Sequence, residues 1–492
     1  MYLASTAQIK QLDKIACERF SFTEESLMDN AAKALSEEIK NTFGANREYV
    51  FFCGRGKNAG DGFLTARNLK LSGAKVRILL TDSEDKLSPA AFQALEKAKK
   101  AIVPIGDISE GVSEKAIIVD ALLGISVSGA PEGSIKQAID IINKCPNTKI
   151  SIDVPSGLNA DSGRFAGSVV KADHTYTLAI DKTGLNIYPG IEYCGEKKLL
   201  DIGIPEQAVA ALQFRTYLSD GETVRAMLPE RKPDGHKGDF GKVGIIGGSE
   251  GMAGSVCLAA EAVLTSGAGM CYVFVPSEIK NTVAAKLTEA IVVDDSRVLE
   301  YFDVLDSIAV GMGHAQNSKA KHIIKTVMQK YTKPVVVDGD GLNQLSANIS
   351  LLKSKKCPVV LTPHTVEFSR LIGISAEEIN KSRIYLTEKF SAEFNVSLVL
   401  KGARSVICKQ GGAVRINPTG NSGMATAGSG DVLSGIIAAL LAQGADTYEA
   451  AVTGVYLHGM AGDFAAAEKT EYSVKAGDII SYLPEAFKKI TK

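Results

Sequence analysis

A glycine-rich run in the last third of the chain carries residues suited to phosphate chemistry. In ATAGSGDVLSG, which begins at Ala425, Gly428 and Gly430 flank Ser429, Asp431 follows, and a long apolar stretch comes next. Backbone N–H groups of a glycine loop at a helix N-terminus stabilise charge on a transferring phosphoryl group. A neighbouring carboxylate can take the proton of an attacking hydroxyl. Asp431 is therefore a candidate base, although an ordinary glycine turn is the alternative.

A second glycine-rich run, GRGKNAGDG at residues 54–62, follows an apolar strand and precedes a helix predicted from Phe63. We expect it to bind an anion, but its spacing matches neither the dinucleotide fingerprint nor the P-loop, so a tight strand-to-helix turn remains the alternative. Asp120 closes the strand IIVD, and Asp153 closes ISID before VPSG. Ligands bind at the carboxyl ends of parallel strands, so both carboxylates are expected on the rim that carries the glycine run. An Asp in such a place can equally cap the following helix.

Short apolar strands and helices alternate along the whole chain, and they must position these residues. In the first half, hydrophobic patterns predict helices over residues 6–20, 24–43 and 63–71, and strands over 49–53 and from residues 75, 116 and 149. In the second half they predict a helix over 253–266, a long helix after Gly428, and strands from about residues 242, 270, 307, 334, 357 and 396. Nearly all-apolar strands that alternate with helices predict parallel sheets covered on both faces, so the fold class is α/β.

The length of the chain predicts two or three folded units, because 492 residues compare with about 100 to 200 for one domain. Residues 228–242 are rich in charge, Pro and Gly, as a linker or a loop over a site would be. We place the boundary near residue 215, which gives domains 1–215 and 216–492.

Charge and composition exclude several classes of protein. Lys plus Arg number 55 and Asp plus Glu 56, a net charge of −1, so neither a nucleic acid nor a membrane is an expected partner. The longest apolar stretch, residues 432–445, is too short to span a membrane and no signal peptide precedes it, so we expect a cytoplasmic protein. The 8 cysteines are scattered without a CxxC, and we expect them reduced and mostly buried. The 47 glycines indicate tight turns or ligand loops.

Four motifs of the first half together resemble one family. They are GRGKNAGDG, VDALLG at residues 119–124, SIDVPSGL at 151–158 and AIDKTGLNIYPG at 179–190. In order and spacing they are similar to the YjeF amino-terminal domain, the NAD(P)HX epimerase family, across about residues 1–210. The resemblance implies a Rossmann-like three-layer domain that interconverts the R and S epimers of hydrated NADH or NADPH.

The same resemblance implies roles for individual residues. Asp153 is the expected general acid/base at the epimerising centre, since a carboxylate at a strand end can shuttle a proton. Asn58, Asp120 and Ser156 are the expected ligands of a potassium ion, and their oxygen atoms suit an alkali cation. The commoner family sequence has Asn, Asn, Gly and Gly at residues 57–60, where this chain has KNAG. The hydrated dinucleotide is expected to contact Lys57, Asn58, Ala59, Gly60, Asp61, Gly124, Ile125, Ser126, Val127, Ser128, Gly129, Ala130 and Asp153.

Further motifs accompany the GSGD run in the second half. They are HKGDFGKVGIIGGS at residues 236–249, GMAGS at 251–255, GMGHA at 311–315, VVVDGDGLN at 335–343, TPHTVEFSRLIG at 362–373, VLKGARSV at 399–406 and NPTGNSGM at 417–424. The set resembles the ribokinase-like superfamily, and more closely its ADP-dependent NAD(P)HX dehydratase branch, the YjeF carboxyl-terminal domain. The resemblance implies a ribokinase-like α/β domain that uses ADP to remove water from the S epimer, releasing NAD(P)H, AMP and phosphate.

In this second resemblance Asp431 deprotonates the C6 hydroxyl of the hydrate, which then attacks the terminal phosphate of ADP. Ala253, Gly313, His364 and Asp431 are expected to contact the hydrate, although His364 could instead be a packed histidine at a strand end. Mg²⁺ is expected with ADP, because the charge of the diphosphate must be neutralised for transfer. The residues expected to bind ADP are Lys401, Gly402, Ala403, Arg404, Ser405, Asn421, Ser422, Gly423, Met424, Ala425, Thr426, Ala427, Gly428, Ser429 and Gly430.

The whole sequence thus predicts a bifunctional repair enzyme for NAD(P)HX with ADP as co-substrate. One alternative is a ribokinase-like small-alcohol kinase with a regulatory first domain, which would accumulate a stable phosphorylated product. Another is that the first half is a non-catalytic binding or assembly module. We expect a homo-oligomer, although the sequence does not fix the oligomeric state, the preference for NADHX or NADPHX, or any coupling between the sites.

Overall fold

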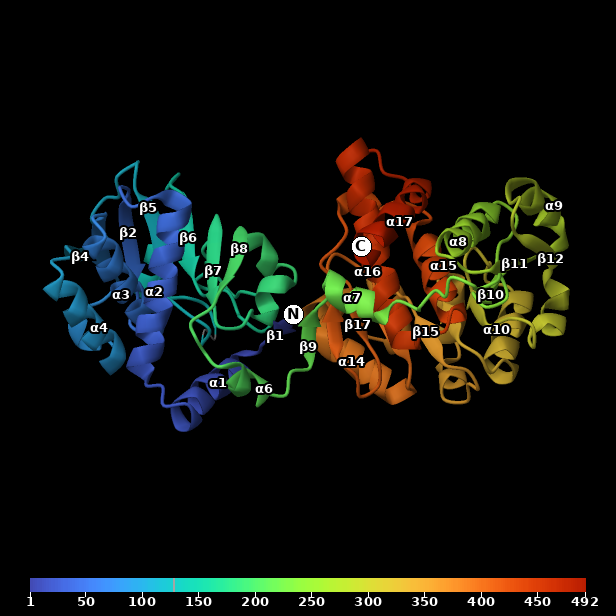
Figure 1. The fold of residues 1–492 in the computed structure, drawn as a ribbon, viewed down its shortest axis with the longest axis horizontal. Coiled ribbons are helices and arrows are strands. Elements are labelled where there is room, and N and C mark those ends of the chain that lie inside the picture. The colour runs from blue at the N-terminus through green and yellow to red at the C-terminus, as the bar shows by residue number, and fades with distance from the viewer. Residues whose placement is uncertain (127–128) are drawn as a thin grey trace. The chain divides into compact units, whose positions relative to one another are not determined.

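The computed structural model describes residues 1–126 and 129–492. The chain divides into two compact units, one of residues Tyr2–Thr216 and one of Met1 with Tyr217–Lys492 (Figure 1). Each unit is an α/β sandwich built on its own sheet, as the alternation of strands and helices predicted. No helix in the described part of the chain has the length and hydropathy needed to cross a lipid bilayer.

The first unit contains a seven-stranded sheet in the order β4-β3-β2-β5-β6-β7-β8, and every neighbouring pair is parallel. The strand order reverses between β2 and β5, and at such a switch point a crevice opens at the carboxyl ends of the strands. Its seven strands are β2 (Glu48–Cys53), β3 (Lys75–Leu80), β4 (Ile105–Asp107), β5 (Ile117–Ala121), β6 (Lys149–Ile152), β7 (His174–Leu178) and β8 (Glu196–Leu200), while the short strand β1 (Tyr2–Leu3) is not part of this sheet.

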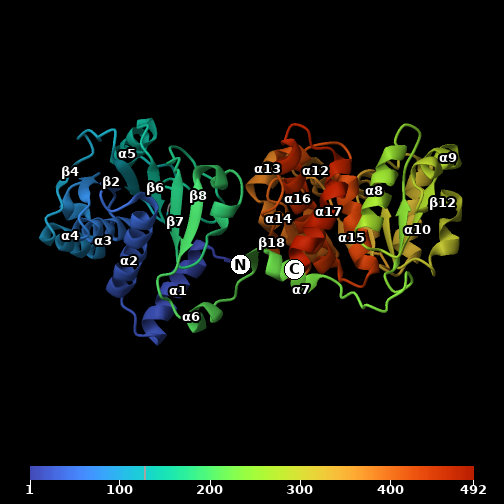
Figure 2. The same cartoon turned by 45° about the horizontal axis from the view of Figure 1, so that its top comes forward.

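Helices cover both faces of this sheet (Figure 2). Because side chains alternate along a strand, Tyr49, Phe51 and Cys53 of β2 pack in the core with α2, α3 and α4, whereas Val50 and Phe52 pack with α5 on the opposite face. The helices of this unit are α1 (Thr6–Arg19), α2 (Glu24–Phe43), α3 (Lys57–Leu71), α4 (Pro89–Lys100), α5 (Gly133–Lys144) and α6 (Glu206–Ala210), with 3₁₀ turns at Glu84–Lys86, Thr183–Asn186 and Gly190–Tyr193.

The sheet of the second unit runs β9-β18-β17-β16-β15-β14-β13-β10-β11-β12. It is parallel from β16 to β12, while β17 and β18 extend it as antiparallel strands that the sequence did not predict. The strand order reverses between β10 and β13. Its strands are β9 (Thr216–Leu218), β10 (Lys242–Ile246), β11 (Met270–Val275), β12 (Ile291–Asp294), β13 (Ser307–Val310), β14 (Val335–Val337), β15 (Val359–Leu361), β16 (Ser397–Leu400), β17 (Val406–Cys408) and β18 (Val414–Ile416).

Two separate cores hold helices on the two faces of this second sheet. One contains residues of α8, α15, α16 and α17, and the other contains residues of α10, α11, α12 and α14. The helices are α7 (Gly221–Met227), α8 (Ala253–Thr265), α9 (Ser277–Lys286), α10 (Ser318–Lys330), α11 (Asp340–Ser346), α12 (Thr365–Ile372), α13 (Ala376–Lys381), α14 (Arg383–Phe394), α15 (Ser429–Ala442), α16 (Thr447–Lys469) and α17 (Ala476–Thr491), with 3₁₀ turns at Asp295–Tyr301, Ile349–Leu352 and Ser422–Met424.

Helix α15, which follows the GSGD run, is buried along almost its whole length. Every residue from Val432 to Leu441 is buried, and the helix packs in one core with α8, α16 and α17. A Cβ added to Gly435 would lie 2.3 Å from the carbonyl oxygen of Ala259, so glycine allows α8 to approach the backbone of α15 closely. The position of the GSGD loop is thereby fixed by the core beneath it.

The start of α3 was predicted wrongly. The helix begins at Lys57 rather than Phe63, so residues 57–61 form its first turn instead of a loop. Gly56 is the N-cap in extended conformation, and the two glycines of the first turn have their own packing reasons. A Cβ on Gly60 would meet the Met28 side chain at 2.6 Å, and one on Gly62 would meet the Ala121 Cβ at 2.6 Å. These glycines therefore allow close packing rather than an open loop.

The expectation about cysteine is confirmed. All eight thiols are free, and six of them are buried, while Cys145 is half-buried and Cys17 is exposed.

Candidate active sites

The crevice of the first unit contains a buried carboxylate at the end of β5. Asp120 is fully buried and accepts hydrogen bonds from the Ser151 hydroxyl (2.8 Å), from the Ser156 backbone N–H (2.9 Å) and hydroxyl (2.5 Å), and from the Leu122 N–H (3.2 Å). Burial raises the pKa of Asp120, and these donors oppose that rise. A buried carboxylate with so many donors is a stable oxygen-rich centre that a cation would neutralise.

Two other predicted potassium ligands lie beside Asp120. The Asn58 side-chain amide donates to the Leu123 carbonyl oxygen (2.9 Å), and the Ser156 hydroxyl accepts from the Leu123 N–H (2.9 Å). A Cβ on Gly124 would lie 3.3 Å from the Asn58 Cβ, so the segment after β5 passes close to the start of α3. The structure therefore brings carboxylate, hydroxyl, amide and carbonyl oxygens together, a donor set that suits K⁺.

Asp153 lies directly after β6 in a strained conformation. Its φ of 65° is in the left-handed region, which a residue with a side chain seldom adopts. Its Oδ1 accepts hydrogen bonds from the Leu178 N–H (3.0 Å) and the Thr177 hydroxyl (3.3 Å), and it forms an ion pair with the Lys182 ammonium. The carboxylate is thereby held at the end of the sheet, where the sequence predicted a proton-transfer group.

Further titratable groups surround Asp153. Burial, followed by the charges of Asp153 and Asp13, raises the pKa of Asp61 in the first turn of α3 well above its usual range. Burial also raises the pKa of Asp13 on α1. Lys57 forms an exposed ion pair with Glu24 (2.5 Å). Neighbouring carboxyl groups with different pKa values are an arrangement that general acid and base chemistry uses.

The predicted contacts of the first unit have different locations. Lys57 to Asp61 form the first turn of α3, and Gly124 lies against Asn58. Ile125 packs beside the core that contains α1, and its carbonyl oxygen accepts a hydrogen bond from the Thr6 hydroxyl (3.3 Å). Ser126, Gly129 and Ala130 are in the loop before α5. Val127 and Ser128 lie outside the described residues.

In the second unit, Asp431 lies in the first turn of α15, after the N-cap Gly428. Gly428 has φ 88°, and a Cβ there would lie 2.4 Å from Leu258 Cδ1, so both backbone and space require glycine. Burial, reinforced by Asp338, raises the pKa of Asp431 to about 6, while a hydrogen bond with the Ser255 side chain and the charge of Lys401 oppose the rise. Asp431 can therefore accept a proton near neutral pH.

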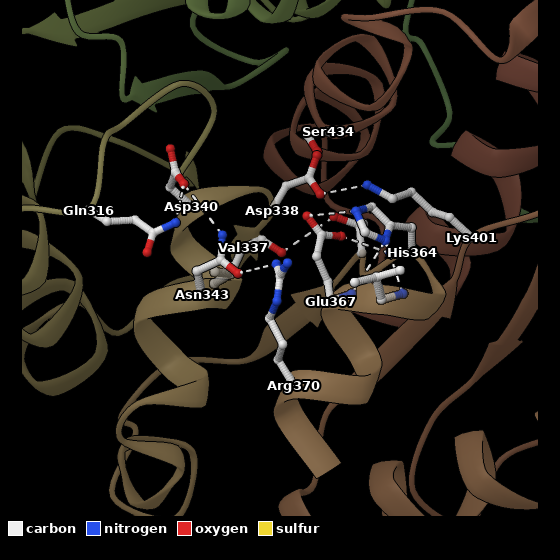
Figure 3. Close-up of polar contacts among 12 residues, drawn as sticks. Gln316, Val337, Asp338, Asp340, Asn343, His364, Glu367, Arg370, Lys401 and Ser434 are labelled. Atoms are coloured by element: carbon white, nitrogen blue, oxygen red, sulfur yellow. Dashed lines mark hydrogen bonds and ion pairs between the residues drawn. The ribbon is translucent and has the colours of Figure 1, made fainter. Parts of the chain in front are cut away.

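A buried ion pair lies beside this carboxylate (Figure 3). The Lys401 ammonium, at the end of β16, donates to Asp338 Oδ1 (2.7 Å), and the Ser434 hydroxyl of α15 donates to Asp338 Oδ2 (2.9 Å). A Cβ on Gly430 would lie 3.1 Å from Lys401 Nζ. The ammonium thus lies against the glycine loop, where a phosphate would bind.

His364 and Glu367 complete this cluster, and Figure 3 shows both beside Lys401. His364 caps α12. Its ring Nδ1 accepts hydrogen bonds from the backbone N–H groups of Val366 (3.1 Å) and Glu367 (3.3 Å), and its backbone N–H donates to Glu367 Oε2 (2.8 Å). Its ring is half exposed, and burial lowers its pKa. Burial raises the pKa of Glu367 to about 7 against the charge of Lys401. The capping role explains how His364 is oriented, and it places Nε2 3.6 Å from Glu367 Oε1.

Hydrogen bonds from neighbouring helices hold the segments that were predicted to bind ADP. Arg383 donates from Nη2 to the carbonyl oxygens of Leu400 (2.9 Å) and Lys401 (3.1 Å), which fixes the start of the 401–405 loop. Asn421 bonds to Asp463 of α16 (2.9 Å), which fixes the start of the 421–430 loop. Buried His458 contacts the Ser429 hydroxyl (3.3 Å), and burial lowers the pKa of His458 to about 4, so the ring stays neutral there.

The other two residues predicted to contact the hydrate, Ala253 and Gly313, come after β10 and β13 in the chain. Ala253 is the first residue of α8, and Gly313 follows β13 with φ 56°. The Gly313 carbonyl oxygen accepts from the Ser249 hydroxyl (2.9 Å), which joins the loops after β10 and β13 at the strand-order switch.

Among the described residues, no group of three or more His, Cys, Asp or Glu side chains is arranged to hold a metal ion. Mg²⁺ is ordinarily held by one or two carboxylates together with substrate phosphates and water, so Asp338 and Glu367 beside a nucleotide would fit it.

Comparison with known proteins identifies the family. Residues 24–184 match the family model described as YjeF-related protein N-terminus, and residues 243–485 match the model described as NAD(P)H-hydrate dehydratase. The bifunctional NAD(P)H-hydrate repair enzyme Nnr of Moorella thermoacetica is 37% identical over 98% of this chain and 96% of its own length. The protein of the same name from Escherichia coli is 34% identical over 96% of this chain and 92% of its own length. The chain belongs to the bifunctional NAD(P)H-hydrate repair enzyme family.

Solved structures are similar to part of this repair-enzyme chain. An ADP/ATP-dependent NAD(P)H-hydrate dehydratase from Bacillus subtilis, co-crystallised with ATP and Mg²⁺, has a TM-score of 0.51 and 29% identity, covering 56% of this chain and 98% of its own. A ribokinase-like superfamily protein from Enterococcus faecalis has a TM-score of 0.51 and 32% identity, covering 57% of this chain and 98% of its own. The ribokinase-like fold predicted from the sequence is confirmed.

Four residues of these sites were missed by sequence reasoning. They are Lys182, Ser255, Asp338 and Glu367, whose contacts are described above. All four lie inside motifs that were noted for other reasons: AIDKTG, GMAGS, VVVDGDG and TPHTVEF. For Asp338 the available signal was an ionisable residue directly after a buried strand, where a charge needs a partner.

Proposed function

We propose that the first domain, residues 1–215, interconverts R and S NAD(P)HX, and that the second, residues 216–492, dehydrates the S epimer with ADP. The observation that carries the proposal is one reactive-carboxylate site at the carboxyl end of each sheet, with Asp153 in one and Asp431 in the other. The curated relatives carry the name of a bifunctional NAD(P)H-hydrate repair enzyme and align over nearly the whole chain. Both halves are therefore treated as catalytic.

In the first domain, epimerisation requires a bond at C6 to break and re-form: the C6 hydroxyl loses its proton while the C6–N1 bond opens to an aldehyde and N1 takes up a proton, and the reverse steps on the other face of the aldehyde give the other epimer. We assign the carboxylate of Asp153 as the group that takes and returns the hydroxyl proton. The first turn of α3 offers the backbone N–H groups of Lys57, Asn58 and Ala59 to the pyrophosphate of the dinucleotide. Asn58, Asp120 and Ser156 would hold K⁺, whose charge would neutralise buried Asp120 and attract an anionic substrate.

In the second domain, Asp431 accepts the proton of the C6 hydroxyl, and the hydroxyl oxygen attacks the β-phosphorus of ADP. The bond to the α-phosphate oxygen breaks, and AMP leaves. The lone pair of the ring nitrogen then expels phosphate from C6, and the departing phosphate takes a proton from C5, which forms the C5–C6 double bond of NAD(P)H. Lys401 and the N–H groups around Gly428 to Gly430 stabilise the transferring phosphoryl group. Mg²⁺ would supply charge neutralisation on the diphosphate, with Asp338 and Glu367 as its protein ligands.

The pH profile of dehydration should report Asp431. Its pKa is raised to about 6, so kcat/KM should be constant above that pH and fall about tenfold per unit below it, because only the ionised form accepts a proton. Ser255→Ala removes a hydrogen bond that favours the ionised form, so its acidic limb should move to higher pH. Initial rates from pH 5 to 8 with S-NADHX and saturating ADP test this. An unchanged limb in Ser255→Ala would contradict the assignment.

The whole proposal is tested by incubating chemically hydrated NADH with the protein, with and without ADP. Recovery of absorbance at the NADH band should require ADP and should extend to both epimers, with AMP and phosphate formed in equal amounts. Recovery of the S form alone would leave the first domain without its enzymatic role. A stable phosphorylated product without NADH would instead support the small-alcohol kinase.

A further inference from the structure

Lys182 is the most deeply buried lysine of the first unit that contacts the epimerase site. Only 1% of its side chain is exposed, and it lies four residues after the end of β7. Burying an ammonium costs free energy unless the charge is paired and every N–H finds an acceptor. The structure meets both conditions at one place. Because the Lys182 side chain is buried, its role must be sought in the groups that its ammonium contacts.

The three donors of the Lys182 ammonium all have acceptors. They go to Asp153 Oδ1, to the Thr177 hydroxyl (3.0 Å) and to the Leu178 carbonyl oxygen (2.7 Å). The Thr177 hydroxyl in turn donates to Asp153 Oδ1 (3.3 Å). The ammonium is therefore fixed by the last two residues of β7, and it cannot swing away without breaking three hydrogen bonds.

The contacts of Asp153 fall on one side of its carboxylate. Lys182, Thr177 and the Leu178 N–H all donate to Oδ1, and within the described residues no hydrogen bond reaches Oδ2. The left-handed backbone at Asp153 sets the direction of the side chain. One oxygen is thus anchored while the other is left for a substrate proton.

The charges around Asp153 are mostly negative. Asp61 on α3 and Asp13 on α1 face it, and Lys57 on α3 is exposed and paired with Glu24 on α2. Carboxylates that share a site resist ionising together. Of the two lysines that act on this cluster, Lys182 is the buried one in direct contact with Asp153. Its positive charge offsets the repulsion from the other carboxylates.

We propose that Lys182 is a positioning residue of the epimerase site, which pairs with Asp153 and anchors its Oδ1 so that Oδ2 faces the hydrate. This inference rests on the proposed role of Asp153 as the proton-transfer group. The ammonium does not itself exchange a proton with the substrate, because its three N–H groups are already used within the protein.

The test is Lys182→Met in the full chain, with each epimer as substrate. We expect kcat/KM of epimerisation to fall by about 100-fold, the scale of a displaced acid/base group. The acidic limb of its pH profile should also move to higher pH, because a carboxylate without its ammonium partner takes up a proton more readily. ADP-dependent dehydration by the same molecules should be unchanged, which shows that the second unit remains folded.

The chain offers a matched control in Lys197→Met. Lys197 forms an ion pair with buried Asp181 (2.5 Å) and also bonds to Asn186, so the variant removes a comparable pair in the same unit. It should lose stability without moving the pH profile. Lys182→Arg keeps the charge, so its acidic limb should stay near that of the parent even if the rate falls.

Three outcomes decide the inference. A shifted limb in Lys182→Met, absent from Lys182→Arg and Lys197→Met, supports it. A Lys182→Met profile that falls in rate but does not shift, as in Lys197→Met, overturns it, and so does a normal rate. If Lys182→Met destabilises the first unit, Thr177→Val gives the same test with a smaller shift, because the Thr177 hydroxyl accepts a hydrogen bond from Lys182 and donates one to Asp153. Retained epimerisation in Asp153→Asn would instead reject the proposed base, independently of Lys182.

Discussion

Replacing Asp431 with Asn should lower kcat of ADP-dependent dehydration by about 10²- to 10⁴-fold, the range for loss of a positioned general base. Asn is close to Asp in size, so the loop at the start of α15 and the hydrogen bond with Ser255 can persist. What disappears is the group that accepts the hydroxyl proton. Because ADP binding relies on Lys401 and backbone N–H groups, KM for ADP should change by much less than kcat.

Epimerisation by the same protein serves as an internal control for Asp431→Asn and should be unaffected. A matched variant is Asp478→Asn, which alters a carboxylate in the first turn of another helix, α17, where it caps the helix and pairs with Lys469. That variant should lose about 1 kcal/mol of stability and keep its activity. Dehydration at the parental rate in Asp431→Asn would mean that another group takes the proton.

Asp153→Asn should lower the rate of epimerisation by about 10²- to 10⁴-fold while dehydration of pure S-NAD(P)HX stays at its parental rate. The variant keeps the size of the side chain but cannot accept a proton, and it leaves the Lys182 ammonium without its charged partner. With a mixture of epimers and ADP, NADH recovery should then stop after the S fraction is consumed. Chromatographic separation of the two epimers during the reaction measures how much of each remains.

Some loss of stability is expected in Asp153→Asn, because a buried cation is left without a counter-charge. Asp181→Asn is the matched comparison, since it disrupts the buried pair with Lys197 in the same unit. If both variants lose epimerase activity equally, the effect of Asp153→Asn is one of folding and not of chemistry.

Much of the fold could be predicted from the sequence, because buried parallel strands leave continuous apolar runs such as VVV before Asp338. The start of α3 could not, because glycines that usually interrupt helices here relieve contacts with Met28 and Ala121. Those contacts join residues far apart in the chain. The antiparallel β17 and β18 were missed because no helix separates β16, β17 and β18, so the alternation of strands and helices does not mark these short strands.

The candidate sites divide in the same way. Asp153 and Asp431 could be proposed because each follows a recognisable motif at a strand end or a helix start. Their partners could not, since Lys182 and Asp338 gain meaning only through burial and through contacts made across neighbouring strands and helices. The sequence does not show whether the charged group of a lysine or an aspartate is buried, or which group it is paired with.

The burial of α15 has a practical consequence for measuring ligands. Its first turn carries the GSGD loop, and its remaining faces belong to the core of the second unit, so the loop and that core should melt together. Nucleotide held by the loop at 100 times its Kd would add about 2.7 kcal/mol to the unfolding free energy. The melting temperature of this unit therefore becomes a binding assay that needs no turnover, and it can rank nucleotides even on catalytically dead protein.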